Sequence, residues 1–188
     1  TTRLAAGALA NILQYLSDPK NARRLATVYK VWRRDERDDE EKSESIRVIS
    51  GLIQKIPRVE DYVYPRAGAD WLVDLENDGV EPDVIEHLVD FRQLIQRWQG
   101  TVLLPVDQMV LTIAQDLFRN TTELAIAHKL ALLLGQVMND RSDWHLPEFT
   151  EELSVIAKNE RRFIGFSEDD SGFDPEAYRG KVVVATMH

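Results

Sequence analysis

The residues that could contact phosphate groups form one cationic run between positions 20 and 34. The run holds six lysines and arginines and no aspartate or glutamate: Lys20, Arg23, Arg24, Lys30, Arg33 and Arg34. Such side chains neutralise DNA phosphates and release counterions. Arg23, Arg24, Lys30, Arg33 and Arg34 are therefore candidate contacts to a DNA backbone. A second interpretation is a solvated helix face that pairs with the acid-rich residues 35–41.

Residue types that perform catalysis are present, but their spacing matches no catalytic or metal-binding motif. The chain has no cysteine and four histidines, none of them three or four positions from another: His87, His128, His145 and His188. We expect His128 to be a hydrogen-bonded core histidine and His145 to be structural or at the surface. The acidic residues 168–176 lack the spacing of a calcium loop. The sequence therefore predicts no catalytic residue and no metal site in this chain.

The composition is that of a folded, acidic protein. Apolar residues make up 44% of the 188 positions, and the formal net charge is -9. This charge argues against a uniformly basic nucleic-acid coat, although a local basic patch is compatible with it. There is no apolar run of membrane-spanning length and no signal-peptide pattern. We expect a cytoplasmic protein with no membrane partner.

Helical spacing of apolar residues covers most of the chain, and Pro, Gly and Asn mark where helices begin and end. Asn77-Asp78-Gly79 indicates a turn, Pro82 the first residue of a helix, and Asn120 followed by Glu123 a helix cap. The predicted helices are, in order, residues 2–17, 19–33, a helix that ends at Pro57, 69–76, 82–100, a helix that begins at Pro105, 124–138 and 146–163. The helix over 124–138 is apolar nearly all round, which predicts that it is the central, most buried element. The predicted fold class is mainly α, a multi-helix, bundle-like unit.

The last residues have a different pattern. Residues 182–185 are Val-Val-Val-Ala, which predicts a buried strand, and Thr186, Met187 and His188 follow. A single strand cannot satisfy its own backbone groups, so we expect it to belong to the sheet of a neighbouring domain. The predicted organisation is a helical domain over 1–165, an acidic linker over 166–180 and a strand over 181–188. The chain is expected to be a piece of a larger protein.

Thr186-Met187-His188, after the strand of residues 182–185, resembles the start of motif V in UvrD/Rep-like superfamily 1 DNA helicases. That motif follows a buried strand and reads approximately Thr-x-His-x-x-Lys-Gly-Leu-Glu. In this family a mostly helical insertion, the 2B subdomain, precedes motif V, and the residues before 166 are similar to it in size and helical character. The resemblance implies that the final strand belongs to a RecA-like domain.

The resemblance also implies a function. The parent protein would be an ATP-dependent DNA helicase that translocates 3′ to 5′ on single-stranded DNA in repair or replication. This chain would supply an accessory, regulatory subdomain, in which Thr186 and His188 lie near the DNA. The loop Gly-x-x-x-x-Gly-Lys-Ser/Thr, which holds nucleotide phosphates, is absent from the chain. ATP and Mg²⁺ would therefore bind elsewhere in the parent, and this chain alone would be inactive, cofactor-free and monomeric.

A different class of function also fits the sequence. The chain could be a free-standing helical protein-interaction module without catalytic activity. Its acidic surface would bind basic partners, and its final strand would add to the sheet edge of another protein.

Overall fold

The computed structural model describes residues 1–159, and all regular elements of this part of the chain are helical. They are, in order, α1 (Thr2–Ser17), α2 (Ala22–Trp32), η1 (Arg34–Glu36), α3 (Glu40–Gln54), α4 (Val59–Val63), α5 (Trp71–Asn77), α6 (Pro82–Gly100), η2 (Thr101–Leu103), α7 (Val106–Leu117), α8 (Thr121–Asp140) and α9 (Leu146–Lys158). The predicted mainly α fold is confirmed for these residues. The predicted linker over 166–180 and strand over 181–188 lie outside them.

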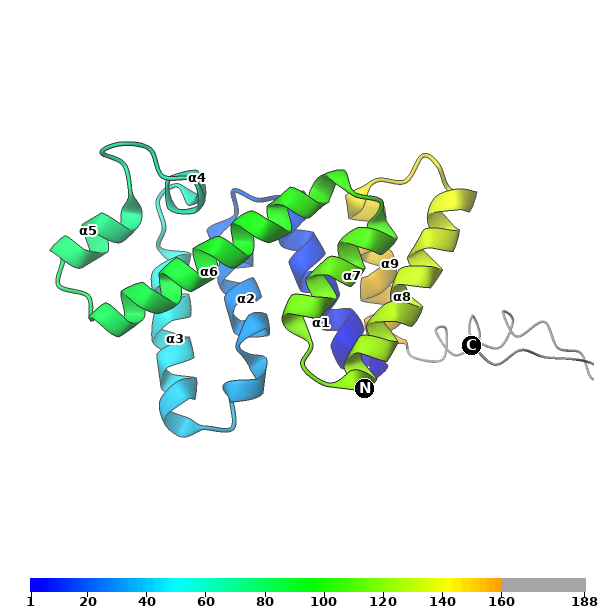
Figure 1. Cartoon of the computed structure of the whole chain (residues 1–188), viewed down its shortest axis with the longest axis horizontal. Helices are drawn as coiled ribbons and strands as arrows, with labels where there is room; N and C mark the ends of the chain where they lie inside the picture. Colours follow the sequence, from blue (N-terminus) through cyan, green and yellow to red (C-terminus); the bar gives the residue numbers. More distant parts are fainter. Residues whose placement is uncertain (160–188) are drawn as a thin grey trace, which may run out of the picture.

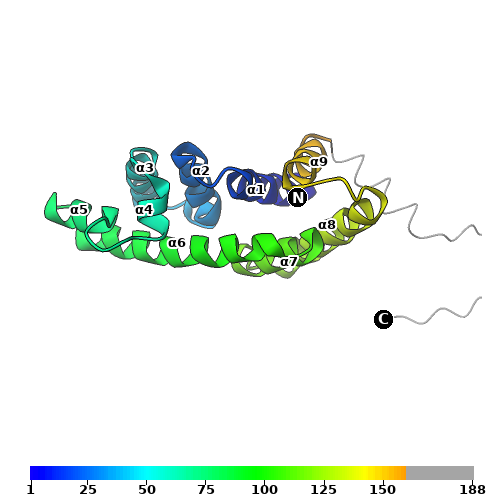
Figure 2. The same ribbon diagram turned by 90° about the horizontal axis from the view of Figure 1, so that it is seen from above.

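The helices form two layers in an elongated unit (Figures 1 and 2). Helices α3, α2, α1 and α9 lie side by side in one layer, and α6, α7 and α8 form the other. The short helices α4 and α5 pack on α6 at the end farthest from α9. Trp32 of α2 stacks on Phe91 of α6 with 5.6 Å between the ring centroids, and Tyr29 meets the same ring edge-on at 5.0 Å. These aromatic contacts join the two layers.

The most buried helix is α1, not α8 as the sequence predicted. Helix α1 packs against α2, α7, α8 and α9, and most of its residues are buried. Helix α8 lies in the outer part of its layer and leaves Leu132 and His128 exposed. The prediction was wrong because the uniform apolar character of residues 124–138 includes side chains that face solvent. Each leucine or isoleucine buried along α1 contributes about 1.5–3 kcal/mol to folding.

Capping side chains decide where several helices begin. Helix α2 begins at Ala22, later than the predicted residue 19, because Asn21 Oδ1 accepts a hydrogen bond from the Arg24 N–H at 3.1 Å. Asp39 Oδ1 accepts from the Lys42 N–H at 3.1 Å and starts α3. Asn120 Oδ1 accepts from the Glu123 N–H at 2.7 Å and starts α8, which confirms the cap predicted there.

The predicted turn after α5 is also present. Gly79 has a φ of 79°, a left-handed conformation that favours glycine, and it ends α5 before Pro82 opens α6. Pro82 is the first residue of α6, and the helix ends at Gly100 as predicted. Helix α9 begins at Leu146 as predicted but ends at Lys158, before the predicted residue 163, and Asn159 is no longer helical. Residues 160–163 of the predicted helix lie outside the described residues. No helix within residues 1–159 is both long and apolar enough to cross a membrane.

Candidate nucleic-acid interface

The cationic run begins just before α2 and ends in η1. Leu25, Val28 and Tyr29 are buried against the neighbouring helices. Burial raises the pKa of Tyr29 to about 12, with the nearby Arg33 charge opposing this rise. The cations emerge around the remaining sides of α2. Their accessibility to a phosphate therefore depends on the partner that each one has within the protein.

Two cations at the start of the run pair with nearby acids. Lys20 Nζ lies 3.3 Å from Glu60 Oε1, at the start of α4. Arg24 Nη1 lies 3.3 Å from Asp18 Oδ2 and donates to the Gln14 carbonyl at 3.2 Å. Both pairs are partly or largely exposed, so they are screened by salt and can exchange partners at little cost.

Arg33 connects η1 to α6. Its guanidinium pairs with Glu36, and its Nη1 lies 2.9 Å from His87 Nδ1. An arginine can only donate, so Nδ1 of His87 is the acceptor. The guanidinium also lies 5.5 Å from the centre of the Trp32 ring. Only 16% of the Arg33 side chain is exposed. A phosphate could reach Arg33 only after these contacts were broken.

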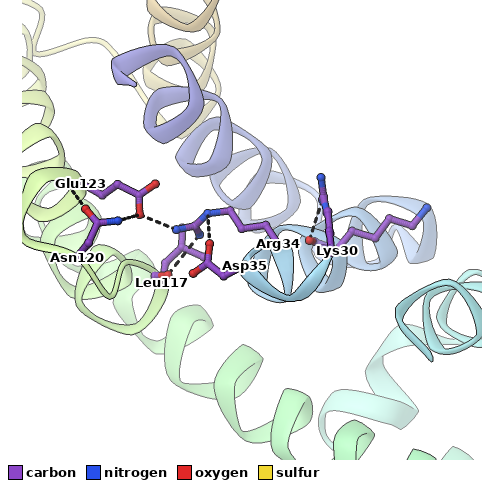
Figure 3. Close-up of polar contacts among 7 residues, drawn as sticks. Lys30, Arg34, Asp35, Leu117, Asn120 and Glu123 are labelled. Atoms are coloured by element: carbon purple, nitrogen blue, oxygen red, sulfur yellow. Dashed lines mark hydrogen bonds and ion pairs between the residues drawn. The ribbon is translucent and has the colours of Figure 1, made fainter. Parts of the chain in front are cut away.

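Arg34 extends from the end of α2 across to the connection between α7 and α8 (Figure 3). Its Nη2 donates to Glu123 Oε2 at 3.0 Å, and its Nη1 donates to the Leu117 carbonyl at 3.3 Å. Asp35 Oδ1 lies 3.5 Å from its Nε, and the guanidinium lies 4.8 Å from the centre of the Phe118 ring. The Arg34 and Glu123 side chains are each only 17% exposed. Arg34 therefore acts as a clamp between the two layers.

Arg23 and Lys30 differ from the other candidates. Neither side chain forms an ion pair with another residue among those described. Arg23 is exposed, and the Lys30 side chain points away from the Arg34 contacts in Figure 3. Only the Lys30 carbonyl is engaged, as the acceptor of a hydrogen bond from Arg37 Nη2 at 2.9 Å. A phosphate backbone could therefore contact these two cations without displacing an ion-pair partner among the described residues.

A groove of about 490 Å³ lies beside this end of α2, between α1, η1 and the start of α8. Its lining includes Arg3, Arg34 and Arg37, together with the apolar side chains of Leu4 and Val31. This groove was not predicted from the sequence, because Arg3 and Arg37 are far apart along the chain. Only the packing of α1 against α2 brings them together.

The other predicted site residues have varied positions. Thr186 and His188 lie outside the described residues. His128 is exposed on α8, so the expectation that it is a core histidine is wrong. His145 is exposed before α9, where its backbone N–H donates to Glu148 Oε2 at 2.8 Å. Within residues 1–159 there is no group of three or more His, Cys, Asp or Glu residues that could hold a metal ion.

Comparison of the chain with protein-family models, curated proteins and solved structures found no match.

Proposed function

We propose that residues 1–159 form an accessory subdomain of an ATP-dependent DNA helicase of the UvrD/Rep type. The observation that carries the proposal is the order of the chain. An all-helical unit is followed by Val-Val-Val-Ala at 182–185 and then by Thr186-Met187-His188. The family has this order, with a helical insertion directly before motif V.

The geometry of α1 and α9 supports an insertion. Arg3 Nε, in the first turn of α1, donates to the carbonyl of Ala157 in the last turn of α9 at 3.1 Å. A Cβ built on Gly7 would lie 3.7 Å from the Cβ of Ala157, so the two helices are in close contact. The two ends of the helical unit thus meet at one place. A host domain can accept such a unit without separating its own strands.

The proposal divides the chemistry between this chain and its parent. The parent binds ATP and Mg²⁺ and translocates 3′ to 5′ on single-stranded DNA in repair or replication. Thr186 and His188 contact that DNA, and the helical unit controls unwinding at the duplex junction. Among the candidate cations between residues 20 and 34, Arg23 and Lys30 are the proposed phosphate contacts, because Arg24, Arg33 and Arg34 have ion-pair partners within the protein.

A free-standing protein-interaction module is the second candidate, and an exposed apolar tip favours it. Leu103, in η2 between α6 and α7, is 94% exposed, and its neighbours Val102 and Leu104 are about half as exposed, at 42% and 41%. Exposed apolar residues in a group are typical of protein contacts. In this alternative the chain binds proteins and has no catalytic partner domain.

The first experiment is to determine the coding sequence beyond His188 and to assay the intact product. The helicase proposal expects Lys-Gly-Leu-Glu to follow within about ten codons, and ATP hydrolysis that single-stranded DNA stimulates. A stop codon directly after His188, with no such hydrolysis, would overturn the proposal and favour the interaction module.

A deletion variant then tests the accessory role. Because Arg3 and Ala157 are in direct contact, about four Gly-Ser residues can replace residues 4–157 without separating the flanking backbone. We expect the shortened helicase to keep DNA-stimulated ATP hydrolysis and to change its rate of duplex unwinding. Arg23→Ala combined with Lys30→Ala is the milder variant of the same test. Loss of ATP hydrolysis in a folded deletion variant would contradict an accessory role.

A further inference from the structure

The outer face of α1 carries a continuous depression. The groove of about 490 Å³ beside η1 adjoins a second depression of about 210 Å³ beside α9, and both are lined by Arg3, Gly7 and Asn11. Gly7 has no side chain, and the Asn11 side chain folds back to donate to the Gly7 carbonyl at 2.9 Å. Neither residue therefore projects far from this face of the helix. The depression therefore runs along α1 from η1 to the last turn of α9.

The charge of this depression is opposite to that of the protein. Its two lining acids, Asp35 and Glu123, both pair with Arg34, whose single positive charge leaves one negative charge over among the three groups. Arg3, Arg37 and Lys158 also line it, and none of these three forms an ion pair with a described residue. The lining thus has four cations and two acids, which leaves two positive charges in excess in a chain of net charge -9. An anionic occupant is the electrostatic complement of this site.

The floor of the depression is apolar. Leu4 is 69% exposed there, and Ala8 and Val31 lie beside it. A small inorganic anion would leave these side chains in contact with water. A peptide that carries both carboxylates and aromatic or aliphatic side chains would cover them and pair with the cations. The groove therefore fits an acidic, amphipathic peptide segment.

We propose that this groove binds the acidic segment of the same chain, residues 166–176. This segment has five acids and two phenylalanines and no lysine or arginine: Phe166, Glu168, Asp169, Asp170, Phe173, Asp174 and Glu176. Its carboxylates pair with Arg3, Arg37 and Lys158, and a phenylalanine covers Leu4 and Val31. The proposal concerns a contact within the chain and does not depend on helicase activity.

Chain connectivity favours this occupant over a separate protein. Helix α9 ends at Lys158, which itself lines the depression, and Glu168 is ten residues farther along. Ten extended residues span about 35 Å, whereas the 16 residues of α1 are about 24 Å long. The segment can therefore reach any point on the face. A tether this short supplies an effective concentration of about 1 mM, so weak charge pairs suffice for binding.

The test uses the absence of cysteine from the full chain. Asp170→Cys, carrying a nitroxide label, should broaden the backbone amide signals of Gly7, Ala8 and Asn11 in the intact protein. Signals from α5, at the other end of the unit, should stay sharp. Arg3→Glu with Arg37→Glu should lower the bound population about tenfold and restore the signals of α1. Lys55→Glu with Arg141→Glu, which reverses two exposed cations outside the groove, is the matched control and should change nothing.

A charge exchange completes the test. Glu168→Arg with Asp169→Arg should abolish the broadening, and adding Arg3→Glu with Arg37→Glu should bring it back. Equal broadening of α1 and α5, or broadening that survives the reversal of Arg3 and Arg37, would overturn the proposal. Broadening that disappears when the chain is diluted at constant salt would also overturn it, because the contact would then be between molecules. None of these outcomes bears on whether the parent is a helicase.

Discussion

The interlayer clamp formed by Arg34 and Glu123 allows a quantitative prediction. Arg34→Met keeps an apolar side chain of similar length and removes the guanidinium. The variant loses a charge-assisted hydrogen bond to Glu123 at 3.0 Å and a longer one to the Leu117 carbonyl at 3.3 Å. It also loses the contact with the Phe118 ring.

The expected cost follows from these contacts. A hydrogen bond to a charged group contributes about 1.5–3 kcal/mol. Removing one partner of a fully buried pair costs about 3–5 kcal/mol, and this pair retains 17% exposure on each side. We therefore expect Arg34→Met to lower the free energy of unfolding by about 2–4 kcal/mol. Glu123→Gln should cost about 1–2 kcal/mol, because the amide oxygen can still accept a hydrogen bond.

The assay is urea denaturation of the full chain, followed by tryptophan fluorescence, for wild type, each single variant and the double variant. The coupling energy between the two positions should be about 1–2 kcal/mol. The dependence of unfolding free energy on urea concentration should have the same slope in all four proteins. The control is a double-mutant cycle on Arg47 and Glu44, an exposed pair on α3 in which Arg47 Nη2 lies 2.7 Å from Glu44 Oε1. This pair should show no measurable coupling energy. The clamp would be refuted if the changes in unfolding free energy at Arg34 and Glu123 were additive. It would also be refuted if Arg34→Met lowered the free energy of unfolding by less than about 0.5 kcal/mol.

Three further predictions concern charge and pH. For DNA binding by the intact parent, Arg23→Ala and Lys30→Ala should each reduce the slope of log binding constant against log salt concentration by about 0.9. An unchanged slope would show that neither residue contacts DNA phosphates. The pKa of Asp70 is below its ordinary value: partial burial alone would raise it, but hydrogen bonds from Arg92 and from the Leu72 N–H outweigh that effect. A lowered folded-state pKa gives stability that is present above about pH 3.9 and is lost as the pH falls further. Asp70→Asn should therefore lower the free energy of unfolding by about 1 kcal/mol at pH 7, and by progressively less below about pH 3.9, in urea titrations. The raised pKa of Tyr29 gives stability that is complete below about pH 10 and is lost as the pH rises towards 12. Tyr29→Phe should therefore reduce the loss of unfolding free energy at pH 11 by about 1 kcal/mol. Equal losses in the wild type and the variant would contradict this assignment.

Local signals in the sequence were sufficient for much of the fold. Pro82, Asn120 and Gly79 act within one turn of their own positions, so the boundaries that depend on them were predictable. The start of α2 was misplaced because Asn21, not Pro19, supplies the capping oxygen. Burial was harder to predict. The apolar pattern of α8 does not reveal which side faces solvent, because that depends on where α1 and α7 pack.

The candidate interface shows the same limit. A run of six cations without an acid suggests one functional surface, but its members have different partners in space. Arg33 meets His87 from α6, 54 positions away, and Arg34 meets Glu123 from α8, 89 positions away. No spacing rule within the run could have identified these contacts. The groove beside Arg3 was missed for the same reason.

The distribution of paired and unpaired cations has a mechanical consequence for the proposed accessory role. Arg33 ties η1 to α6, Arg34 ties it to α8, and Asp116 of α7 accepts hydrogen bonds from Arg97 and Trp98 of α6 at 3.0 and 2.9 Å. The aromatic contacts of Tyr29 and Trp32 of α2 with Phe91 of α6 add a further connection between the two layers. A phosphate that captured Arg33 or Arg34 would have to break contacts worth several hydrogen bonds, about 1.5–3 kcal/mol each. In the proposed role, DNA would therefore contact Arg23 and Lys30, which can be engaged without loosening the helices, and the subdomain should reorient as a rigid body.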